Sequence, residues 1–342
     1  MNQDRLEITE FRAVLTHWFK QNGRRLPWRE TWDPYSILVS ELMLQQTQVG
    51  SVIGHYRDWL KRFPTLRDLA HADESEVLLA WQGLGYYARA RNLHKSAKLL
   101  VERKNAIFPT AVDELLKLPG IGRYTAGAIA SFAFDLPAPV VDANIQRVVS
   151  RILNIREPIN KPAVARKIWD FADQYARGPN PRILNSALME LGATVCLARS
   201  PHCSRCPVRT FCAAENPAKL PVKKEPQKVE RKTEAHILAL REGQILLLQS
   251  QGRRWHGLWI LPALRPRLQF HHQVAVSRPL VTLSYSITRY LVRLNVFPVE
   301  PPAVLEAGEA WHPLDSVACL PMPSPHRRAM SAALALNGER NS

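Results

Sequence analysis

Four cysteines lie close together in the second half of this chain of 342 residues. They are Cys196, Cys203, Cys206 and Cys212, and their spacing, C-x6-C-x2-C-x5-C, allows a single loop to bring four thiolates around one centre. A tetrahedral zinc site usually takes two separated C-x2-C pairs, and this loop contains one. The spacing therefore favours an iron–sulfur cluster, with zinc and reduced structural thiols as the alternatives that it leaves open.

Disulfide bonds are the weakest interpretation of these cysteines. The fifth cysteine, Cys319, lies in a distant segment, and the N-terminal residues, with Asp4 and Glu7 among them, do not resemble a secretory signal. The chain also contains no apolar run long enough for a membrane-spanning helix. We therefore expect a cytoplasmic protein without disulfide bonds.

Glu41 lies within the apolar segment Tyr35–Leu44, for which the residue pattern predicts a helix. On that helix the carboxyl group projects on or beside the apolar stripe. Partial burial raises the pKa of a carboxylic acid, which would make Glu41 a proton donor near neutral pH. The structural alternative is a buried ion pair with one of three preceding arginines: Arg24, Arg25 or Arg29.

Asp142 stands where the extended stretch Pro137–Asn144 opens a helix. Aspartate is a favoured N-cap residue, and this structural role is compatible with a catalytic one. A carboxylate that accepts backbone N–H bonds has a lowered pKa, so we expect Asp142 to stay ionised and to face a developing positive charge. Together the two carboxyl groups can divide the cleavage of a glycosidic bond, since one protonates the leaving group and the other stabilises an oxocarbenium-like sugar.

The segment Leu118–Thr125 joins two predicted helices and contains Gly120 and Gly122. Glycine lets the backbone turn tightly and leaves amide N–H groups exposed at the start of the next helix. Such a turn can clamp a phosphate without reading bases, and a plain helical hairpin is the alternative. The formal net charge of +16 also predicts a polyanionic partner, for which DNA or RNA is favoured over a membrane.

The elements that must position these residues are mostly helices. The pattern predicts helices at Ile8–Phe19, Tyr35–Val49, Leu66–Ala72, Glu74–Gln82, Ala88–Arg103, Arg123–Phe134, Asn144–Leu153, Val164–Tyr175 and Ile183–Leu191. A further helix that ends near Leu118 is expected to begin with a capping box formed by Thr110 and Asp113.

The composition changes after Cys212. A basic stretch with three prolines, residues 217–233, predicts a semi-extended linker. Beyond it the pattern predicts strands at His236–Leu240, Gln244–Gln249, Val281–Ser286 and Tyr290–Phe297, a turn at Glu242–Gly243 and a short final helix after Pro321–Pro325. We therefore expect a multi-domain protein, with an all-α domain over residues 1–216, the linker over 217–233 and an α+β domain over 234–342.

The order of these features resembles that of the helix-hairpin-helix DNA glycosylases. The hairpin covers residues 113–134, Asp142 follows, and the four-cysteine loop covers residues 196–212. The 6-2-5 cysteine spacing is similar to the loop that holds a [4Fe-4S] cluster in that superfamily, so the resemblance implies this cofactor. The stretches ELMLQQTQV (41–49) and WQGLGYYARARNL (81–93) resemble the adenine-specific branch, the MutY-type adenine DNA glycosylases.

The resemblance implies a monofunctional glycosylase of base excision repair without strong lyase activity. The strand-cutting branch carries a lysine where Tyr124 stands, and tyrosine cannot form a Schiff base. The implied partner is double-stranded DNA, and the implied substrate is adenine opposite 8-oxoguanine or guanine, flipped from the duplex. A monomeric, nucleoid-associated enzyme of bacterial type is expected.

The resemblance also assigns roles to residues of this sequence. Glu41 protonates adenine, Asp142 stabilises the sugar cation, and Tyr124 and Asn144 position them. The adenine-pocket residues are Arg24, Leu26 and Trp28. The residues that hold the orphan base are Gln46, Thr47, Leu84 and Tyr86, with Tyr86 as a stacking wedge. Gly120 and Gly122 contact the DNA backbone, and Ser186 stands where relatives commonly carry Gln or Glu.

The C-terminal segment, which includes WHGLWILP (255–262), resembles the MutT-like (Nudix-like) domain that helps this family to recognise 8-oxoguanine. No acidic REx2EEx-type sequence follows it, so diphosphate hydrolysis is not expected. Ser284 and Tyr285 resemble the loop that inspects 8-oxoguanine, where the family often has Phe-Ser-His. Two other functions are kept as alternatives: a thymine glycosylase acting on T:G mismatches, and a non-catalytic mismatch-binding protein.

Overall fold

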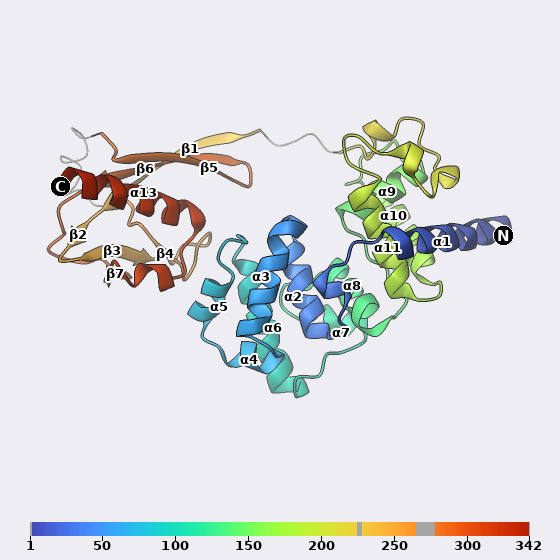
Figure 1. Cartoon of the computed structure of the whole chain (residues 1–342), viewed down its shortest axis with the longest axis horizontal. Coiled ribbons are helices and arrows are strands. Elements are labelled where there is room, and N and C mark those ends of the chain that lie inside the picture. Colours follow the sequence, from blue (N-terminus) through green and yellow to red (C-terminus); the bar gives the residue numbers. More distant parts are fainter. Residues whose placement is uncertain (1, 224–227, 265–277, 342) are drawn as a thin grey trace. The chain divides into compact units, whose positions relative to one another are not determined.

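The computed structural model of the chain describes residues 2–223, 228–264 and 278–341. Its contacts divide the chain into two compact units: Met1–Ala70 with Asn92–Glu225, and His71–Arg91 with Pro226–Ser342. We call them the helical unit and the sheet unit (Figure 1). The segment His71–Arg91 thus belongs by its contacts to the sheet unit, although it lies in the helical half of the sequence.

The first 222 residues fold mainly into helices joined by short connections. In chain order these are α1 (Asn2–Asn22), the 3-10 turn η1 (Pro27–Arg29), α2 (Pro34–Leu44), α3 (Val49–Arg62), α4 (Leu66–His71), α5 (Glu74–Ala80), α6 (Ala88–Lys104), α7 (Val112–Leu115), α8 (Arg123–Phe134), α9 (Ala143–Ile152), α10 (Pro162–Ala176), α11 (Pro181–Thr194) and the 3-10 turns η2 (Cys203–Arg205), η3 (Arg209–Phe211) and η4 (Pro217–Lys219). One apolar core joins α1, α9, α10 and α11, and Leu15, Val149 and Leu188 are fully buried in it. This core fixes the start of α9 and one face of α11.

The predicted helix Tyr35–Val49 ends earlier than expected. In the structure α2 ends at Leu44 and α3 begins at Val49. Between them Gln46 has a φ of 57°, a left-handed conformation that cannot continue a helix. Helix α3 is absent from the sequence-based predictions, although its buried residues Val52, Tyr56 and Trp59 follow helical spacing.

The predicted capping box at Thr110 and Asp113 is wrong. Helix α7 has four residues, and its N-cap is Ala111, which has no side-chain oxygen. The chain enters this helix one residue later than expected, so the backbone carbonyl of Ala111 accepts the first N–H groups instead. The other predicted helices agree with the structure to within a few residues, with two exceptions. The first helix, α1, is longer at both ends. The final helix, predicted to be short, has 18 residues from Ser324 to Asn341, since Ala329, Met330 and Ala333 continue to pack into a core.

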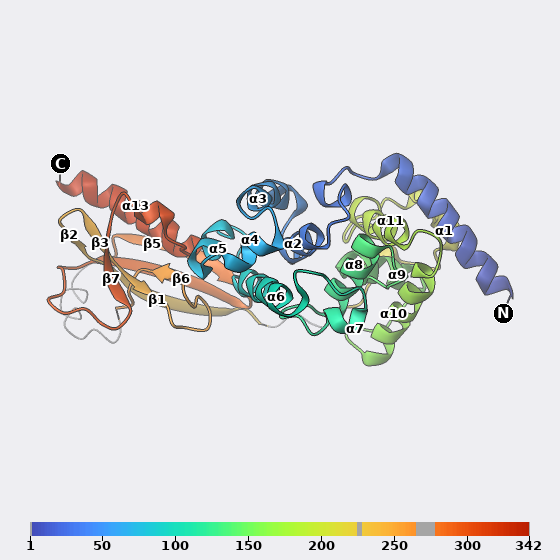
Figure 2. The ribbon, with the colours of Figure 1, turned by 90° about the horizontal axis from the view of Figure 1, so that it is seen from below.

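The sheet unit contains two small sheets. In the first, β6 (Tyr290–Pro298) pairs in parallel with β1 (Glu230–Leu238) and antiparallel with β5 (Val281–Ile287). In the second, β3 (Gln244–Gln249) pairs with β2 (Leu240–Arg241), β4 (Trp259–Ile260) and β7 (Glu309–Pro313), all antiparallel. Helix α13 (Ser324–Asn341) packs against β5 and β6, as Figure 2 shows. Their shared core includes Leu238, Leu294 and Met330.

The turn at Glu242–Gly243 is present, and both of its residues have positive φ, at 48° and 73°. Three of the four predicted strands are present as expected, whereas His236–Leu240 is divided after Leu238 between β1, which pairs with β6, and β2, which pairs with β3. The short strands β4 and β7 are absent from the predictions. The expected linker, residues 217–233, is shortened at both ends, since η4 begins it and β1 starts at Glu230. Residues 224–227 of that linker lie outside the described residues.

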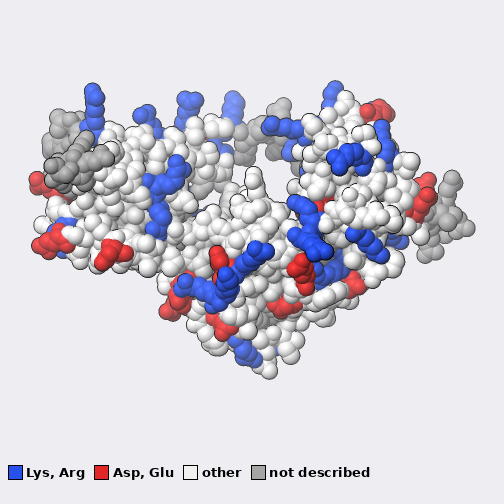
Figure 3. Space-filling model, viewed as in Figure 1, with Lys and Arg blue, Asp and Glu red and all other residues white. Residues whose placement is uncertain are grey.

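Two surface properties bear on the partner. Lys and Arg side chains are spread across the face drawn in Figure 3, whereas acidic side chains gather in a few places. This distribution agrees with the net charge of +16. Within the part of the chain that the structure describes, no helix is long and apolar enough to cross a membrane.

Candidate active site and cysteine loop

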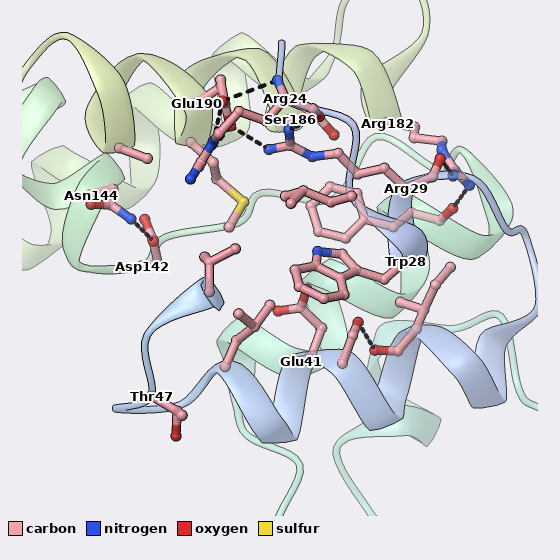
Figure 4. A pocket seen from close by; sticks show the side chains of 18 residues that line it. Arg24, Trp28, Arg29, Glu41, Thr47, Asp142, Asn144, Arg182, Ser186 and Glu190 are labelled. Carbon is pink, nitrogen blue, oxygen red and sulfur yellow. Dashed lines mark hydrogen bonds and ion pairs between the residues drawn. The ribbon is translucent and has the colours of Figure 1, made fainter. Parts of the chain in front are cut away.

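A pocket with a volume of about 170 Å³ opens in the helical unit (Figure 4). Its walls come from η1, α2, the start of α9 and one face of α11. The lining residues are Arg24, Leu26, Trp28, Arg29, Ile37, Ser40, Glu41, Leu44, Thr47, Val49, Phe132, Asp142, Asn144, Arg182, Ser186, Met189, Glu190 and Ala193. The fold thus brings Glu41 and Asp142 to one cavity together with all three residues expected in the adenine pocket.

Glu41 lies in α2 and is 3% exposed. Its Oε2 atom accepts a hydrogen bond from the Tyr124 hydroxyl at 2.5 Å. Burial raises the pKa of Glu41 to about 7; the Asp142 charge adds to the shift, and Tyr124 and Arg29 oppose it. A carboxyl group with this pKa is protonated in a large fraction of molecules at neutral pH, so it can donate a proton into the pocket.

Asp142 is the N-cap of α9. Its Oδ1 atom accepts from the Ile145 N–H at 2.7 Å, and its Oδ2 atom accepts from Asn144 Nδ2 at 2.7 Å. Burial raises the pKa of Asp142, while these hydrogen bonds and the Arg147 charge oppose the shift. The expectation of a lowered pKa is therefore wrong in direction, because the donors reduce the effect of burial without reversing it.

The buried Glu190 binds two of the three arginines that line the pocket. Arg24 Nε donates to its Oε1 atom at 2.6 Å, and Arg29 Nη2 donates to its Oε2 atom at 2.8 Å. Burial opposes ionisation of Glu190, but these contacts outweigh it and hold its pKa below the usual value. The ion pair that the sequence offered as an alternative for Glu41 thus forms on Glu190 instead.

Arg147 links the start of α9 to the cysteine loop. Its Nη2 atom donates to Asn144 Oδ1 at 2.8 Å and to the Gly192 carbonyl at 2.7 Å, and its Nε atom donates to the Cys196 carbonyl at 2.7 Å. Asn144 in turn donates to Asp142. Gly192 is required here, because a Cβ atom would lie 2.7 Å from the Asn144 Cβ. The position of Asp142 therefore depends on the loop that begins at Cys196.

The hairpin turn between α7 and α8 leaves its outer face open. Gly120 has a φ of 74°, and a Cβ atom there would lie 2.6 Å from the Asn92 side chain, so another residue does not fit. Gly122 is exposed, and a Cβ atom there would meet no atom within 4 Å. Tyr124, two residues later, points inward to Glu41. One short segment thus serves both the surface and the pocket.

The four residues expected to hold the orphan base divide between the two units. In the helical unit, Thr47 lines the pocket and Gln46 is exposed in the break between α2 and α3. In the sheet unit, Leu84 is buried, whereas Tyr86 is 49% exposed. A buried Leu84 supports its turn rather than offering a surface to DNA.

Ser284 and Tyr285 lie in strand β5, as the strand predicted at Val281–Ser286 requires, and not in the loop that the family resemblance implied. Ser284 pairs with Arg293 and Tyr285 with Val292 across the ladder to β6. Ser284 is exposed. The Tyr285 hydroxyl donates to Glu234 Oε2 at 2.9 Å and accepts from Arg254 Nη2 at 3.1 Å. Tyr285 is thus engaged in an ionic network on one face of the sheet.

The four cysteines follow α11, are half-buried and form no disulfide bond with one another. Burial raises the pKa of Cys206 to about 11, and the other three cysteines add to the shift, so the four side chains lie within electrostatic reach of one another. The buried Arg151 donates to Cys196 Sγ at 3.2 Å and to the carbonyls of Leu197 and Ala198. Four adjacent thiols and a cation that stabilises the thiolate form fit a thiolate-bound cluster. Within the described residues, no three His, Cys, Asp or Glu side chains are arranged to hold a single metal ion.

Two pocket residues of α11, Arg182 and Glu190, are absent from the sequence-based predictions, which name only Ser186 on that helix. Arg182, Ser186 and Glu190 stand four residues apart in α11 and therefore share one face. Extending the helical face of Ser186 by one turn in each direction would have found the other two. Arg147 likewise lies three residues after Asn144 in α9, on the face that carries it.

Two protein-family models match the chain. The HhH-GPD superfamily of base excision DNA repair proteins matches residues 39–174, which include Glu41, Tyr124 and Asp142. The iron–sulfur binding domain of endonuclease III matches residues 196–212, which begin and end at a cysteine. The chain therefore has an iron–sulfur loop, and the expected [4Fe-4S] cofactor is confirmed over zinc and over free structural thiols.

Curated relatives match much of the chain. It is 44% identical over 221 residues to a human protein named adenine DNA glycosylase, which covers 62% of the chain and 40% of the relative. It is 38% identical over 253 residues to an adenine DNA glycosylase of Buchnera aphidicola subsp. Baizongia pistaciae, which covers 73% of the chain and 71% of the relative. The chain thus spans about two-fifths of the human protein's length and most of the bacterial one's.

A solved structure described as a thermostable thymine-DNA glycosylase is also similar. It matches with a TM-score of 0.56 and 28% sequence identity, and it covers 61% of this chain and 97% of that one.

Proposed function

This chain belongs to the adenine DNA glycosylase family, and we propose on that premise that it hydrolyses the N-glycosidic bond of adenine mispaired with 8-oxoguanine or guanine in DNA. The observation that carries the proposal is the single pocket lined by Glu41 and Asp142. An acid with a pKa of about 7 and a carboxylate held by hydrogen-bond donors are the pair that such a cleavage requires.

In the proposed reaction, adenine is flipped out of the duplex into the pocket. Glu41 donates its proton to the base, at N7, so that the bond between N9 and C1′ breaks with its electron pair on the base. Asp142 stabilises the positive charge that develops on the sugar. Water then attacks C1′ and gives a proton to the Glu41 carboxylate, which restores the starting state.

Neighbouring residues have positioning roles in this scheme. Tyr124 orients the Glu41 carboxyl group, and Asn144 orients that of Asp142. Trp28 offers an aromatic face in the pocket for the base. Tyr124 has no amine for a Schiff base, so the enzyme is monofunctional and leaves the strand intact.

The partner in this proposal is double-stranded DNA, bound by a monomer. The open glycine turn before α8 and the net charge of +16 support phosphate contacts. The cluster, held by Cys196, Cys203, Cys206 and Cys212, would act structurally, because Arg147 joins its loop to Asn144. The sheet unit would act as the MutT-like domain that recognises 8-oxoguanine, with Ser284 and Tyr285 on its exposed strand.

A thymine glycosylase acting on T:G mismatches is the second candidate, because a structure with that title is similar to this chain. Single-turnover reactions on duplexes holding A:8-oxoguanine, A:G or T:G separate the candidates. We expect the adenine strand to break only after treatment with alkali, which shows excision without lyase activity. Breakage of the thymine strand alone would favour the second candidate. Tight binding of a mismatch without any excision would show a non-catalytic binding protein.

A further inference from the structure

The turn that carries Tyr86 has an unusual backbone. Tyr86 has a φ of 47°, and it follows Gly83 and Gly85, whose φ values are 100° and 68°. Glycine adopts such conformations readily, but tyrosine does so at a cost that persists only where the surrounding structure holds it. The contacts that hold this turn therefore decide how the exposed Tyr86 ring is presented.

One set of contacts is local. Arg89 Nη2 donates to the carbonyls of Leu84 and Gly85 at 2.8 and 3.0 Å, and its guanidinium lies 5.6 Å from the centre of the Tyr86 ring. Trp81 Nε1 also donates to the Gly85 carbonyl at 3.1 Å. These bonds hold the carbonyls of Leu84 and Gly85 in the middle of the turn. The residues that flank the turn, Gln82 and Tyr87, are held by other contacts.

A second set comes from the C-terminal part of the sheet unit. Arg327 Nη2 donates to Gln82 Oε1 at 3.1 Å, and the Met322 N–H lies 3.5 Å from the same oxygen. On the other side of the turn, the Tyr87 hydroxyl donates to the Met322 carbonyl at 3.3 Å, and both residues are buried. We call Gln82, Tyr87, Met322 and Arg327 the clamp, because they hold the residues that flank Gly83–Tyr86.

The clamp is itself well anchored. Arg327 Nη2 also donates to the Leu320 carbonyl at 2.6 Å, and Arg327 Nη1 donates to the Val317 carbonyl at 3.3 Å. Met322 is completely buried in the core beneath α13. A charge-assisted hydrogen bond from a fixed guanidinium is stronger than one between neutral groups, so the Arg327–Gln82 contact is the main restraint at its end of the turn.

We propose that the clamp fixes the conformation of the Tyr86 turn and that Gln82 and Arg327 are positioning residues for the stacking of Tyr86 on DNA. The proposal rests on the proposed function and on the role that the family resemblance implies for Tyr86, which is to stack beside the orphan base. Without the clamp, a smaller fraction of molecules presents the ring in the binding conformation, and the apparent affinity for the mismatch falls by that fraction. The C-terminal sheet domain thereby contributes to mismatch recognition through the Tyr86 turn as well as through its own surface.

The test uses Gln82→Ala and Tyr86→Ala, separately and combined, in the full cluster-containing protein. Single-turnover excision is measured at enzyme concentrations below saturation on an A:8-oxoguanine duplex, with 2-aminopurine beside the 8-oxoguanine to report stacking. We expect Gln82→Ala to slow excision about tenfold and to reduce the fluorescence change on binding, as for a lost charge-assisted hydrogen bond. In the Tyr86→Ala background, Gln82→Ala should change the rate less than about twofold, because the two residues act as one unit.

Two further variants make the result decisive. Gln244→Ala, at another half-buried glutamine of the sheet unit, is the matched control and should leave excision and fluorescence unchanged. Tyr87→Phe removes only the hydroxyl bonded to Met322 and should give a smaller loss of the same kind. The proposal would be overturned if Gln82→Ala and Tyr87→Phe excised adenine at the wild-type rate. It would also be overturned if Gln82→Ala slowed excision equally in the wild-type and Tyr86→Ala backgrounds. A wild-type protein that excises adenine from no duplex would instead overturn the proposed function, and the fluorescence signal would still test the clamp.

Discussion

Two glutamates, one in each unit, accept a hydrogen bond from a tyrosine hydroxyl, yet the pKa of one is raised and the pKa of the other is lowered. In the helical unit, Glu41 accepts from Tyr124 at 2.5 Å, and burial raises its pKa to about 7. In the sheet unit, Glu234 accepts from Tyr285 at 2.9 Å. Burial also disfavours the ionised form of Glu234, but its charged and hydrogen-bonding neighbours lower its pKa to about 2.

The difference lies in the groups that reach each carboxylate: the His236 ring acts on Glu234 by a hydrogen bond, and the Arg254 guanidinium by its charge. Arg254 Nη2 lies 2.9 Å from Glu234 Oε1, and His236 Nε2 lies 3.8 Å from Glu234 Oε2. The pocket around Glu41 also contains Arg24 and Arg29, but both are bonded to Glu190. The third arginine of the pocket, Arg182, donates to the backbone carbonyls of Arg29 and Thr31. Glu190 therefore offsets part of the positive charge near Glu41, and Arg29 opposes the raised pKa without reversing it, which is how a pocket rich in arginine can retain a proton donor.

The largest expected effect comes from replacing Glu41, and the same replacement of Glu234 serves as its control. Glu41→Gln should slow adenine excision by about 10²–10⁴-fold, because the side chain keeps its shape but has no proton to donate at neutral pH. Glu234→Gln is the matched control and should leave the single-turnover excision rate at saturating enzyme unchanged. Equal losses in the two variants would show that the contrast in pKa has no catalytic meaning.

Asp142→Asn should produce the next largest effect, a fall in excision of about 10²–10³-fold with duplex binding retained. The charge that faces the sugar is lost, while the bonds from Ile145 and Asn144 indicate that the side chain can keep its place. Gel-shift titration and single-turnover kinetics measure the two properties separately. Near-wild-type excision by this variant would remove Asp142 from the mechanism.

Glu190→Gln tests whether the partner of the two arginines protects the acid. It leaves Arg24 and Arg29 without their buried counter-charge, so the free energy of unfolding should fall by about 3–5 kcal/mol. The released positive charge should also lower the pKa of Glu41 and move the alkaline loss of activity to lower pH. Urea denaturation and a pH–rate profile measure these effects, and an unmoved profile would contradict the protective role.

The smallest expected effect is on the way the free energy of unfolding changes with pH, and it also tests Glu41. Because the folded pKa of Glu41 is about 7 and its unfolded pKa is 4.5, the unfolded state ionises first as pH rises, and the wild type loses stability between these values. Relative to wild type, Glu41→Gln should gain on the order of 3 kcal/mol at pH 8 and nothing below pH 4.5. Denaturation curves at both pH values check the difference. A variant no more stable than wild type at pH 8 would mean that Glu41 ionises as readily in the fold as in the unfolded chain.

Some properties of these carboxyl groups can be predicted from the sequence, and others cannot. The raised pKa of Glu41 follows from its place in an apolar helix, which the sequence displays. The direction for Asp142 could not be foreseen, because burial and the donors oppose each other and their balance depends on the depth of the pocket. Glu190 and Arg147 act only through contacts between segments far apart in the chain, so no local pattern marks them.

The same distinction applies to the fold. Helix α8 and strand β3 have the bounds that periodicity predicts, since each follows a local apolar repeat. The break after Leu44 and the assignment of His71–Arg91 to the sheet unit depend on long-range packing, which periodicity does not record. For Ser284 and Tyr285 the local pattern was the better guide, because the strand predicted at Val281–Ser286 contains both residues and pairs with β6, whereas the family resemblance implied a loop.

The amino-acid sequence by itself determined which reactive groups are present: four thiols in one loop, an acid in an apolar helix and an aspartate at a helix start. Those properties are local, because they depend on residue type and spacing alone. Only the tertiary structure decided that the acid and the aspartate share a cavity and that the arginines bind Glu190 rather than Glu41. Electrostatic interactions act through space over a few ångströms, and that proximity is set by the packing of distant segments.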